Sequence, residues 1–522
     1  MTAEHSARTE ALLQNLASSQ TSLSRLLAPG HVVVEIGPSA LQLPQAQLIV
    51  SFTVNLIARL HPVVQQLTIV IPREVDVAVA VPRWLAPSLA AHLTTLLRAL
   101  PKQVSWTITT VAPHERDCAL NIGDVRPGAQ AGSMFIGSDK WEVYFSPTRA
   151  VPIGNGVNPV GAYAAACIGV AEIWKRLLAR HPEHFDNAVI RPQAEPLTFS
   201  TFTYLAAAGQ NPLLPLTIDI GRMTVAGVGA GGGAAIFTLA SLPNLAGHIN
   251  LIDPDTIESS NINRYVIADA LDVSNKAHKV AVAANILKRF SALQTACCSD
   301  PFSKCNGLTA EDYRYVVAAV HSREARRDIQ METPEVLWDA GATQDGEFRI
   351  WRMILGQTEC MYCKHPPGED DLEYQKAAQV AKLLGLDRDL CLGKIKNHDP
   401  FSEEECSAIA ALVKRHGYEF DAPYPGQRFN DWEQEQCGKL KLANLDDEVP
   451  IPFAPVMAGV LLAGELIKQR YFPEYVLNSR YSNTLMGKFM TRTRPFRRTP
   501  RENCSFCHDP IYLSQYRRRW KT

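Results

Sequence analysis

The stretch MTVAGVGAGGGAAIFTLASLPNLAGHINLIDPDTIESSNINR, residues 223–264, decides the fold of the second half of the chain. Its apolar start predicts a strand, its glycines a tight turn, and the segment AAIFTLASL a helix that leads to a second strand. Gly227, Gly229 and Gly232 form the pattern G-x-G-x-x-G, and Asp253 ends the second strand. This order of elements, with an acid at the second strand end, is typical of a nucleotide-binding α/β domain.

The glycine turn predicts a phosphate site. Glycine lets the backbone come close to a phosphate, and a helix N-terminus supplies N–H donors and the positive end of a dipole. Asp253 could bind ribose hydroxyls. Two alternatives stay open on this evidence: glycines that serve only the packing of helix on sheet, and a dinucleotide dehydrogenase.

The polar residues after Asp253 favour a different nucleotide. The run Ser-Ser-Asn-Ile-Asn-Arg, then Asp272-Val273 and Lys279, resembles the signature of the ThiF, MoeB and ubiquitin-activating family. The resemblance implies Rossmann-like adenylation domains that use Mg-ATP to adenylate the C-terminal carboxylate of a ubiquitin-like protein. It implies nucleotide-binding roles for Gly227, Gly229, Gly231, Gly232, Asp253, Asp255, Asn261, Arg264 and Lys279.

The chemistry of adenylation accounts for these residue types independently. A carboxylate that attacks the α-phosphate of ATP brings two anions together, so the site needs cations that hold the triphosphate. Arg264 and Lys279 could supply them as catalytic residues, with Asn261 as a neutral hydrogen-bond partner. Ser274 stands where the family usually has glycine, and the lysine lies two residues late, so Lys276 is an alternative to Lys279. The remaining alternative is that these cations are ordinary surface charges.

One position departs from the family. The family usually has an aspartate after the next strand that helps to place magnesium, and this chain has His321 there. Histidine is a poor magnesium ligand, because hard cations prefer oxygen. Asp255 or Asp339 could compensate, or the metal could be held mainly by phosphate oxygens.

The first half of the chain predicts a degenerate copy of the second. HVVVEI (31–36) and LTIVIP (67–72) are apolar runs typical of buried parallel strands, but their turn has the single glycine Gly37 and no acid ends the second strand. Each half closes with a helix of small residues, at about 159–179 and 449–471. Both helices have the same spacing of proline, glutamate and lysine: Pro159, Glu172 and Lys175, then Pro452, Glu465 and Lys468.

These repeats predict an internal duplication. We expect an inactive adenylation-like domain at 1–185, a proline-rich linker at 186–215 and an active adenylation domain at 216–522. The two domains would form an intramolecular pseudo-dimer. A chance match of the two helices is the alternative.

Two Cys-x-x-Cys pairs predict a structural zinc site. Cys360, Cys363, Cys504 and Cys507 would give the four thiolates of a closed tetrahedral site. Two independent redox dithiols, or unpaired buried cysteines, are the alternatives. Twelve cysteines in a chain with no secretory signal favour metal-binding or catalytic thiols over disulfides.

An inserted segment at 368–448, expected to be small and helical, carries three further cysteines: Cys391, Cys406 and Cys437. Cys437 precedes the closing helix, as the reactive cysteine of ThiF-like proteins does, and is followed by Gly438 and Lys439. A flexible thiol beside a lysine suits a nucleophile. We therefore predict Cys437 as the thioester-forming residue, with Cys406 or Cys391 as alternatives, or none of the three.

Composition bounds the partners. The net charge is −1, so no basic field argues for nucleic acid, and no apolar run is long enough for a membrane span. A cytoplasmic location is expected. The resemblance implies a ubiquitin-like protein with a C-terminal glycine, a conjugating enzyme and possible homodimerisation. The chain is most similar to the bacterial members of this family, which occur in antiphage operons. A sulfur-carrier adenylyltransferase without a thioester, or a non-catalytic scaffold, are the alternatives.

Overall fold

The computed structural model describes residues 30–79, 81–125, 132–185, 190–206, 211–343, 345–366, 372–418, 420–436, 451–491 and 497–520, together with Leu13 and Ala28. The chain divides into two compact units, residues 1–360 with 450–522, and residues 361–449. The larger unit contains two sheets, and we call the parts built on them the first half and the second half.

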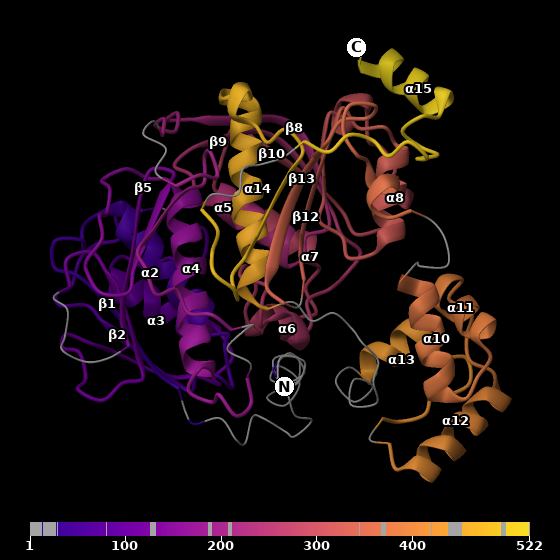
Figure 1. Cartoon of the computed structure of the whole chain (residues 1–522), viewed down its shortest axis with the longest axis horizontal. Coiled ribbons are helices and arrows are strands. Elements are labelled where there is room, and N and C mark those ends of the chain that lie inside the picture. Colours follow the sequence, from indigo (N-terminus) through magenta and orange to yellow (C-terminus); the bar gives the residue numbers. More distant parts are fainter. Residues whose placement is uncertain are drawn as a thin grey trace. The chain divides into compact units, whose positions relative to one another are not determined.

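The first half is a seven-stranded sheet in the order β3-β2-β1-β4-β5-β6-β7 (Figure 1). The first five strands in this order run parallel to one another. β6 pairs antiparallel with β5, and β7 pairs antiparallel with β6. The strands are β1 (His31–Ile36), β2 (Gln66–Val70), β3 (Ser105–Thr109), β4 (Cys118–Ile122), β5 (Ser133–Asp139), β6 (Glu142–Ser146) and β7 (Leu197–Ser200). The first sheet therefore extends into the segment predicted as a linker, since β7 lies within 186–215.

The second half repeats this topology strand for strand, in the order β10-β9-β8-β11-β12-β13-β14. Again five strands are parallel and the last two antiparallel. The strands are β8 (Ile218–Ala226), β9 (Leu245–Ile252), β10 (Leu293–Cys298), β11 (Tyr315–Ala318), β12 (Val336–Ala342), β13 (Glu347–Met353) and β14 (Arg480–Thr484). The predicted pair of Rossmann-like domains is confirmed, and the shared order supports a duplication.

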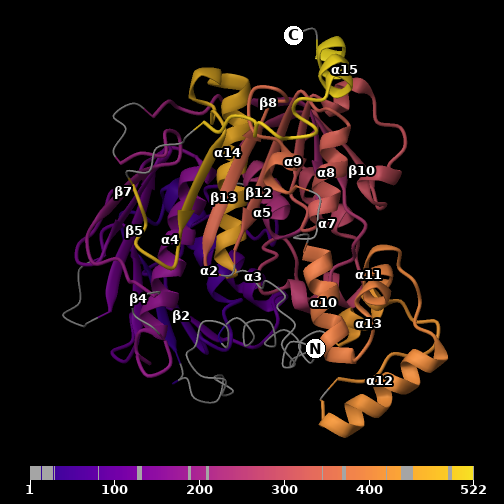
Figure 2. The ribbon, with the colours of Figure 1, turned by 45° about the vertical axis from the view of Figure 1, so that its right-hand side comes forward.

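Four helices form the contact between the halves. They are α2 (Pro44–Ile57) and α4 (Pro159–Leu178) of the first half, and α5 (Ala230–Ala240) and α14 (Phe453–Tyr471) of the second. α4 and α14 lie side by side, each against the sheet of its own half (Figure 2). Small residues allow this close packing: a Cβ on Gly464 of α14 would lie 3.1 Å from Val160 of α4. The other helices of the unit are α3 (Leu89–Ala99), α6 (Ala270–Ser274), α7 (Lys279–Leu287), α8 (Arg323–Met331) and α15 (Pro510–Trp520).

The repeated glutamate and lysine of the closing helices form buried ion pairs, Glu172 with Lys175 and Glu465 with Lys468. Each lysine also reaches the opposite half. Lys175 Nζ lies 3.3 Å from the carbonyl oxygen of Gly487, just after β14, and Lys468 Nζ donates to the carbonyl of Phe202, just after β7 (2.8 Å). Buried charges need such partners, so the spacing read from the sequence marks a reciprocal contact between the halves.

The smaller unit is helical, as predicted for the insertion. It contains α9 (Met361–Lys364), α10 (Leu372–Leu384), α11 (Arg388–Lys396), α12 (Glu403–His416) and α13 (Phe429–Glu435). Its own core gathers aliphatic side chains around Phe401, Phe420, Phe429 and Trp432. The Trp432 indole donates to the carbonyl of Asp421 (2.8 Å), which satisfies its buried N–H.

Candidate nucleotide site and metal centre

The glycine turn joins β8 to α5 as predicted. Gly227 has φ +90°, and a Cβ there would lie 2.5 Å from the backbone of Ala319. A Cβ on Gly232 would lie 2.0 Å from the Gly227 carbonyl oxygen. Packing therefore requires glycine at both positions, and the tight-packing explanation accounts for them.

The other two glycines have a different environment. A Cβ on Gly229 would meet no atom within 4 Å, and one on Gly231 would meet only the Pro455 carbonyl oxygen, at 3.6 Å. Gly229 is also the N-cap of α5, and no side chain caps that end. Protein packing thus gives no reason for glycine at Gly229, whereas a phosphate close to the backbone would.

Asp253 connects the glycine turn to the end of β9. Its Oδ2 accepts from the Val228 N–H (2.7 Å) and its Oδ1 from the Asp255 N–H (3.0 Å). Burial raises the pKa of this carboxyl, while Lys279 opposes the rise. Each carboxylate oxygen keeps a further lone pair for a hydroxyl donor. Asp253 can therefore hold the turn and a ribose at the same time.

The side chain of Lys279, the first residue of α7, points toward Asp253 and Asp255. Its Nζ lies 2.6 Å from Asp255 Oδ2 and 4.0 Å from Asp253 Oδ1. Its side chain is mostly buried, whereas the Asp255 carboxylate is half-exposed. Lys276 is exposed, with φ +47°. The geometry favours Lys279 over Lys276 as the lysine of the site.

Asn261 and Arg264 lie in the segment between β9 and α7, which includes the short 3-10 helix η2 (Ser259–Asn261). Asn261 Oδ1 accepts from the Glu258 N–H (3.1 Å), so this side chain first serves to cap the loop. The Arg264 guanidinium donates to the Ser260 carbonyl (3.1 Å) and to Asn263 Oδ1 (2.9 Å). The amide nitrogen of Asn263 is buried without a hydrogen-bond partner in the described part of the chain. Their nucleotide roles stay predictions.

The two carboxylates considered as magnesium ligands, those of Asp339 and Asp255, differ in accessibility. Asp339 is fully buried and pairs with Arg326 Nε of α8 (2.9 Å). His321 is exposed, and its carbonyl accepts from Arg326 Nη1 (3.0 Å). Asp255 is the more accessible of the two carboxylates considered as substitutes. Of the two, Asp255 has the accessible carboxylate that a bound cation would need.

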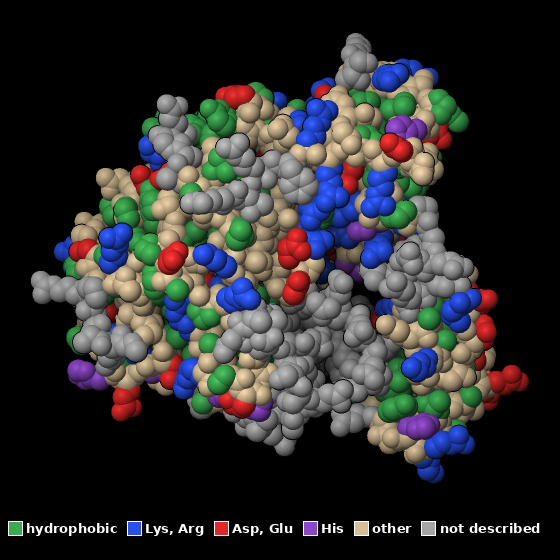
Figure 3. Space-filling view, viewed as in Figure 1, with side chains coloured by type: hydrophobic (Ala, Val, Ile, Leu, Met, Phe, Trp, Pro, Cys, Tyr) green, Lys and Arg blue, Asp and Glu red, His purple; other side chains and the backbone are tan. Residues whose placement is uncertain are grey.

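Positive charge gathers at this side of the second half. Figure 3 shows Lys and Arg side chains over α8 and the neighbouring strands β12 and β13. α8 begins two residues after His321 and carries Arg323 and Arg326, and β13 carries Arg349. Such a surface favours the approach of anions.

In the first half, a carboxylate of the protein itself lies at the turn that corresponds to the glycine turn. Asp124 Oδ1 accepts from the Ser39 N–H (3.2 Å), and a Cβ on Gly37 would lie 2.1 Å from the same oxygen. A carboxylate at the turn repels phosphate. This arrangement agrees with the prediction that the first half is the degenerate copy.

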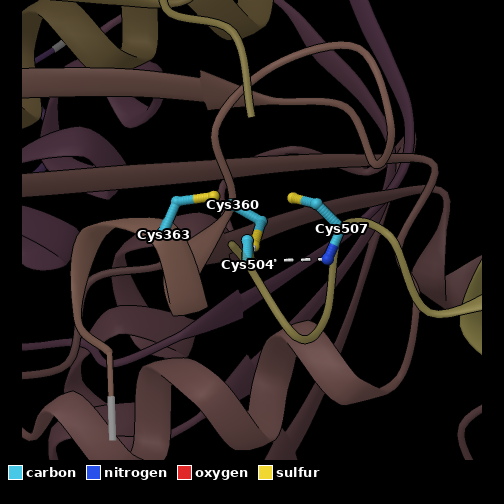
Figure 4. A group of neighbouring side chains, drawn as sticks. All are labelled: Cys360, Cys363, Cys504 and Cys507. Carbon is cyan, nitrogen blue, oxygen red and sulfur yellow. Dashed lines mark hydrogen bonds between the residues drawn. The ribbon is translucent and has the colours of Figure 1, made fainter. Parts of the chain in front are cut away.

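The four predicted zinc ligands meet in one cluster. Their sulfur atoms lie within 4.8 Å of one another, and all four residues are buried (Figure 4). Cys360 Sγ and Cys504 Sγ are 3.7 Å apart. A tetrahedral site with Zn–S bonds of about 2.3 Å needs sulfur atoms about 3.8 Å apart, so the cluster fits zinc. Four cysteine ligands would leave no open position, so a zinc ion bound here would be structural.

The structure describes two of the three cysteines of the insertion. Cys391 and Cys406 belong to the core of the helical unit. Burial raises the pKa of Cys391 to about 11, and it also raises that of Cys406. Both are therefore poor nucleophiles at neutral pH. Cys437 lies outside the described residues, and its assignment stays a prediction.

The expectation of metal-binding or catalytic thiols rather than disulfides does not hold for one pair. Cys298 at the end of β10 is bonded to Cys305, with Cα atoms 6.2 Å apart. No sequence motif predicts this bond, because a separation of seven residues matches none.

Arg59 and Arg83 of the first half are further candidate residues that no sequence pattern predicts. Arg83 pairs with Asp269 and Asp272 (both 2.8 Å), beside the loop that carries Arg264. Arg59 contacts the same loop through backbone carbonyls. No local pattern marks such residues, since their partners are about 200 positions away.

A strand, a glycine turn, a helix and a buried acid on the neighbouring strand define a Rossmann-type nucleotide-binding domain. The model of the ThiF family matches residues 216–506, more than half of the chain. The chain belongs to the ThiF family. This membership supports an adenylyltransferase that uses ATP.

A second family model, named Prokaryotic E2 family C, matches residues 39–179. The two cysteines of this segment, Cys118 and Cys167, are both buried. Burial raises the pKa of Cys118 to about 11 and raises that of Cys167 as well. The segment therefore offers no reactive thiol, although it is similar to that family.

Other similarities are more distant. A Sinorhizobium fredii protein named "Uncharacterized protein y4jF" is 25% identical over 518 residues, which cover 94% of this chain and 91% of that protein. Crystal structures of E. coli MccB are similar at 17% identity, with a TM-score of 0.31 for the complex with MccA-N7isoASN and 0.30 for MccB alone. They cover 55% of this chain and 67% and 65% of the respective MccB chains. No described helix combines the length and apolar composition that a membrane crossing requires.

Proposed function

We propose that this protein adenylates the C-terminal carboxylate of a ubiquitin-like protein with ATP, at the second half of a fused pseudo-dimer. The observation that carries the proposal is the meeting of the open glycine turn, Asp253 and Lys279 at the carboxyl ends of β8 and β9. Ligands of open α/β sheets bind at such strand ends. We retain 1–185 as the inactive domain, 186–215 as the connection, which also supplies the edge strand β7 of the first sheet, and 216–522 as the active domain.

The residues divide the work of adenylation. The N–H groups at Gly229 and Gly231 would bind phosphate oxygens, and Asp253 the ribose. Arg264 and Lys279 would neutralise the triphosphate, and Asp255 would help to hold magnesium, which supplies further positive charge. The substrate carboxylate oxygen then attacks the α-phosphorus, the bond to the β-phosphate oxygen breaks, and pyrophosphate leaves with an acyl-adenylate formed.

A second step would use Cys437. Its thiolate attacks the acyl carbonyl carbon, AMP leaves, and the ubiquitin-like protein is held as a thioester for transfer to a separate conjugating enzyme. The burial of Cys391 and Cys406 supports Cys437 over these two alternatives. The absence of a reactive thiol in 39–179 supports a conjugating enzyme on another chain. From the resemblance we infer a pathway of bacterial antiviral defence in the cytoplasm, with homodimerisation as a further expectation.

Adenylation predicts exchange of label between pyrophosphate and ATP. The purified chain should catalyse exchange only when a ubiquitin-like protein from a neighbouring gene is present. The same protein lacking its C-terminal glycine is the control and should give no exchange, because the attacking carboxylate is displaced. Exchange that is independent of the C-terminus would contradict adenylation of that carboxylate, and no exchange with any such protein would favour a scaffold.

The thioester predicts a separable effect of Cys437. Cys437→Ala should leave pyrophosphate exchange within about twofold of wild type and abolish the thiol-sensitive adduct on non-reducing gels, since adenylation precedes the cysteine step. Cys406→Ala is the matched control and should keep the adduct. If Cys437→Ala still supports conjugation, the alternative of a sulfur-carrier adenylyltransferase without a thioester takes its place.

A further inference from the structure

The loop that carries Arg264 has little structure of its own. Between η2 and α7 its regular structure is α6, a single short helix. Arg264 and Tyr265 donate their N–H groups back to the Asn261 carbonyl (3.1 and 3.0 Å). Contacts with the rest of the protein must therefore fix the path of the segment from Ile262 to Asp272.

The first half supplies those contacts, chiefly through Arg59. Arg59 follows α2 and is 1% exposed. Its Nη1 donates to the Ile262 carbonyl (2.6 Å), and its Nη2 donates to the Ala268 carbonyl (2.9 Å) and more weakly to the Val266 carbonyl (3.5 Å). One guanidinium thus holds the backbone on both sides of Arg264.

Other residues of the first half extend this clamp. Asn55 accepts from Arg59 Nε (2.9 Å) and donates to the Val266 carbonyl (3.0 Å). Arg83 binds Asp269 and Asp272, and the Trp84 indole donates to Asp269 Oδ2 (3.2 Å). The planar, fixed geometry of guanidinium suits such multiple hydrogen bonds.

Packing alone does not explain an arginine at position 59, because burying its charge is unfavourable. Within the described part of the chain its hydrogen bonds go to three carbonyls and one amide, not to a carboxylate. Burial lowers its pKa to about 9, and the charges of Asp269 and Asp272 oppose that effect. The side chain is still charged at neutral pH. Burial of such a charge is costly, and hydrophobic residues of similar volume often stabilise a protein as well or better.

The duplication provides an internal comparison. α2 ends at its C-cap Ala58 and α5 at its C-cap Ser241. The next residue is Arg59 in the first half and Leu242, which is fully buried, in the second. The first half thus directs an arginine at the loop of the active half, whereas the active half places a leucine at the corresponding position.

We propose that Arg59 is a positioning residue for adenylation: from the inactive half it sets the backbone on both sides of Arg264. This inference rests on the proposed adenylation by the second half. It gives the degenerate copy a role in catalysis without a nucleotide of its own.

The test compares Arg59→Met, Arg59→Lys and Leu242→Met. Arg59→Met should lower kcat of pyrophosphate exchange by about 10- to 100-fold, because small displacements of catalytic groups have effects of this size. The KM for the ubiquitin-like protein should change by less than about twofold, and Arg59→Lys should be intermediate. Leu242→Met, at the corresponding position of the active half, should match wild type.

Hydrogen exchange of the free protein gives a readout that does not depend on activity. Amides of 262–268 should exchange at least about tenfold faster in Arg59→Met, while those of β8 and β9 are unchanged. If Arg59→Met does not fold, Arg59→Lys and Asn55→Ala are measured in the same way. The inference would be overturned if any folded variant of Arg59 showed both the wild-type rate of pyrophosphate exchange and the wild-type rates of amide hydrogen exchange. A wild-type protein without pyrophosphate exchange would refute the proposed function instead, and the amide measurement would still test the clamp.

Discussion

Replacing Lys279 by methionine is expected to reduce pyrophosphate exchange by about 10²- to 10³-fold, the usual cost of removing a group that stabilises developing charge. The Lys279 Nζ lies 2.6 Å from Asp255 and 4.0 Å from Asp253, at the place where we expect the triphosphate. The loss should appear mainly in kcat. Steady-state exchange at saturating ATP measures it.

Lys276→Met is the matched control. Lys276 lies three residues earlier on the same loop and is exposed, so its replacement should change exchange by less than about threefold. A large loss in Lys276→Met with normal activity in Lys279→Met would mean that the family signature has been aligned to the wrong lysine.

Cys504→Ser is expected to remove zinc from the purified protein and to loosen the C-terminal segment. The cluster ties the segment after β13 to residues 504–507 through buried thiolates. Structural zinc contributes folding free energy directly, on the order of 10 kcal/mol in small zinc-finger peptides. Here α15 has other anchors, such as the Tyr516 hydroxyl on the Glu335 carbonyl (2.9 Å). We therefore expect faster proteolysis near 497–520 and a lower melting temperature, with the rest of the fold intact.

Metal analysis should find about one zinc per chain in wild type and in Cys297→Ser, an exposed cysteine outside the cluster. Chelation of wild type should reproduce the protease sensitivity of Cys504→Ser. If the wild-type protein instead holds no metal and forms disulfides between the pairs, the redox alternative is correct.

The fold could be predicted because its signals are local. The glycines around Gly227, the acid at Asp253 and the spacing of Glu465 and Lys468 each reflect a backbone or burial constraint within one helix or one turn. Each appears in the structure where the pattern placed it. The cysteine pairs could be predicted for the same reason, since Cys-x-x-Cys is a complete half-site.

The remaining features depend on residues that meet only in three dimensions. Arg59 reaches carbonyl oxygens, which carry no sequence identity, so nothing near residue 262 reveals the contact. The short strand β7 lies in a proline-rich segment, and only its pairing with β6 makes it a strand. The nucleotide roles of Arg264 and Asn261 stay predictions, because in the free protein both side chains bind their own loop.

The reciprocal lysines of the closing helices have a consequence for how the activity depends on concentration. Lys175 and Lys468 each complete their hydrogen bonding across the contact between the halves. In a site shared by two separate chains, such contacts are lost on dilution below the dissociation constant. Here both halves belong to one polypeptide, so the effective concentration of each for the other is fixed by the connection. At fixed concentrations of ATP and of the ubiquitin-like protein, adenylation per molecule should therefore not fall when the chain itself is diluted.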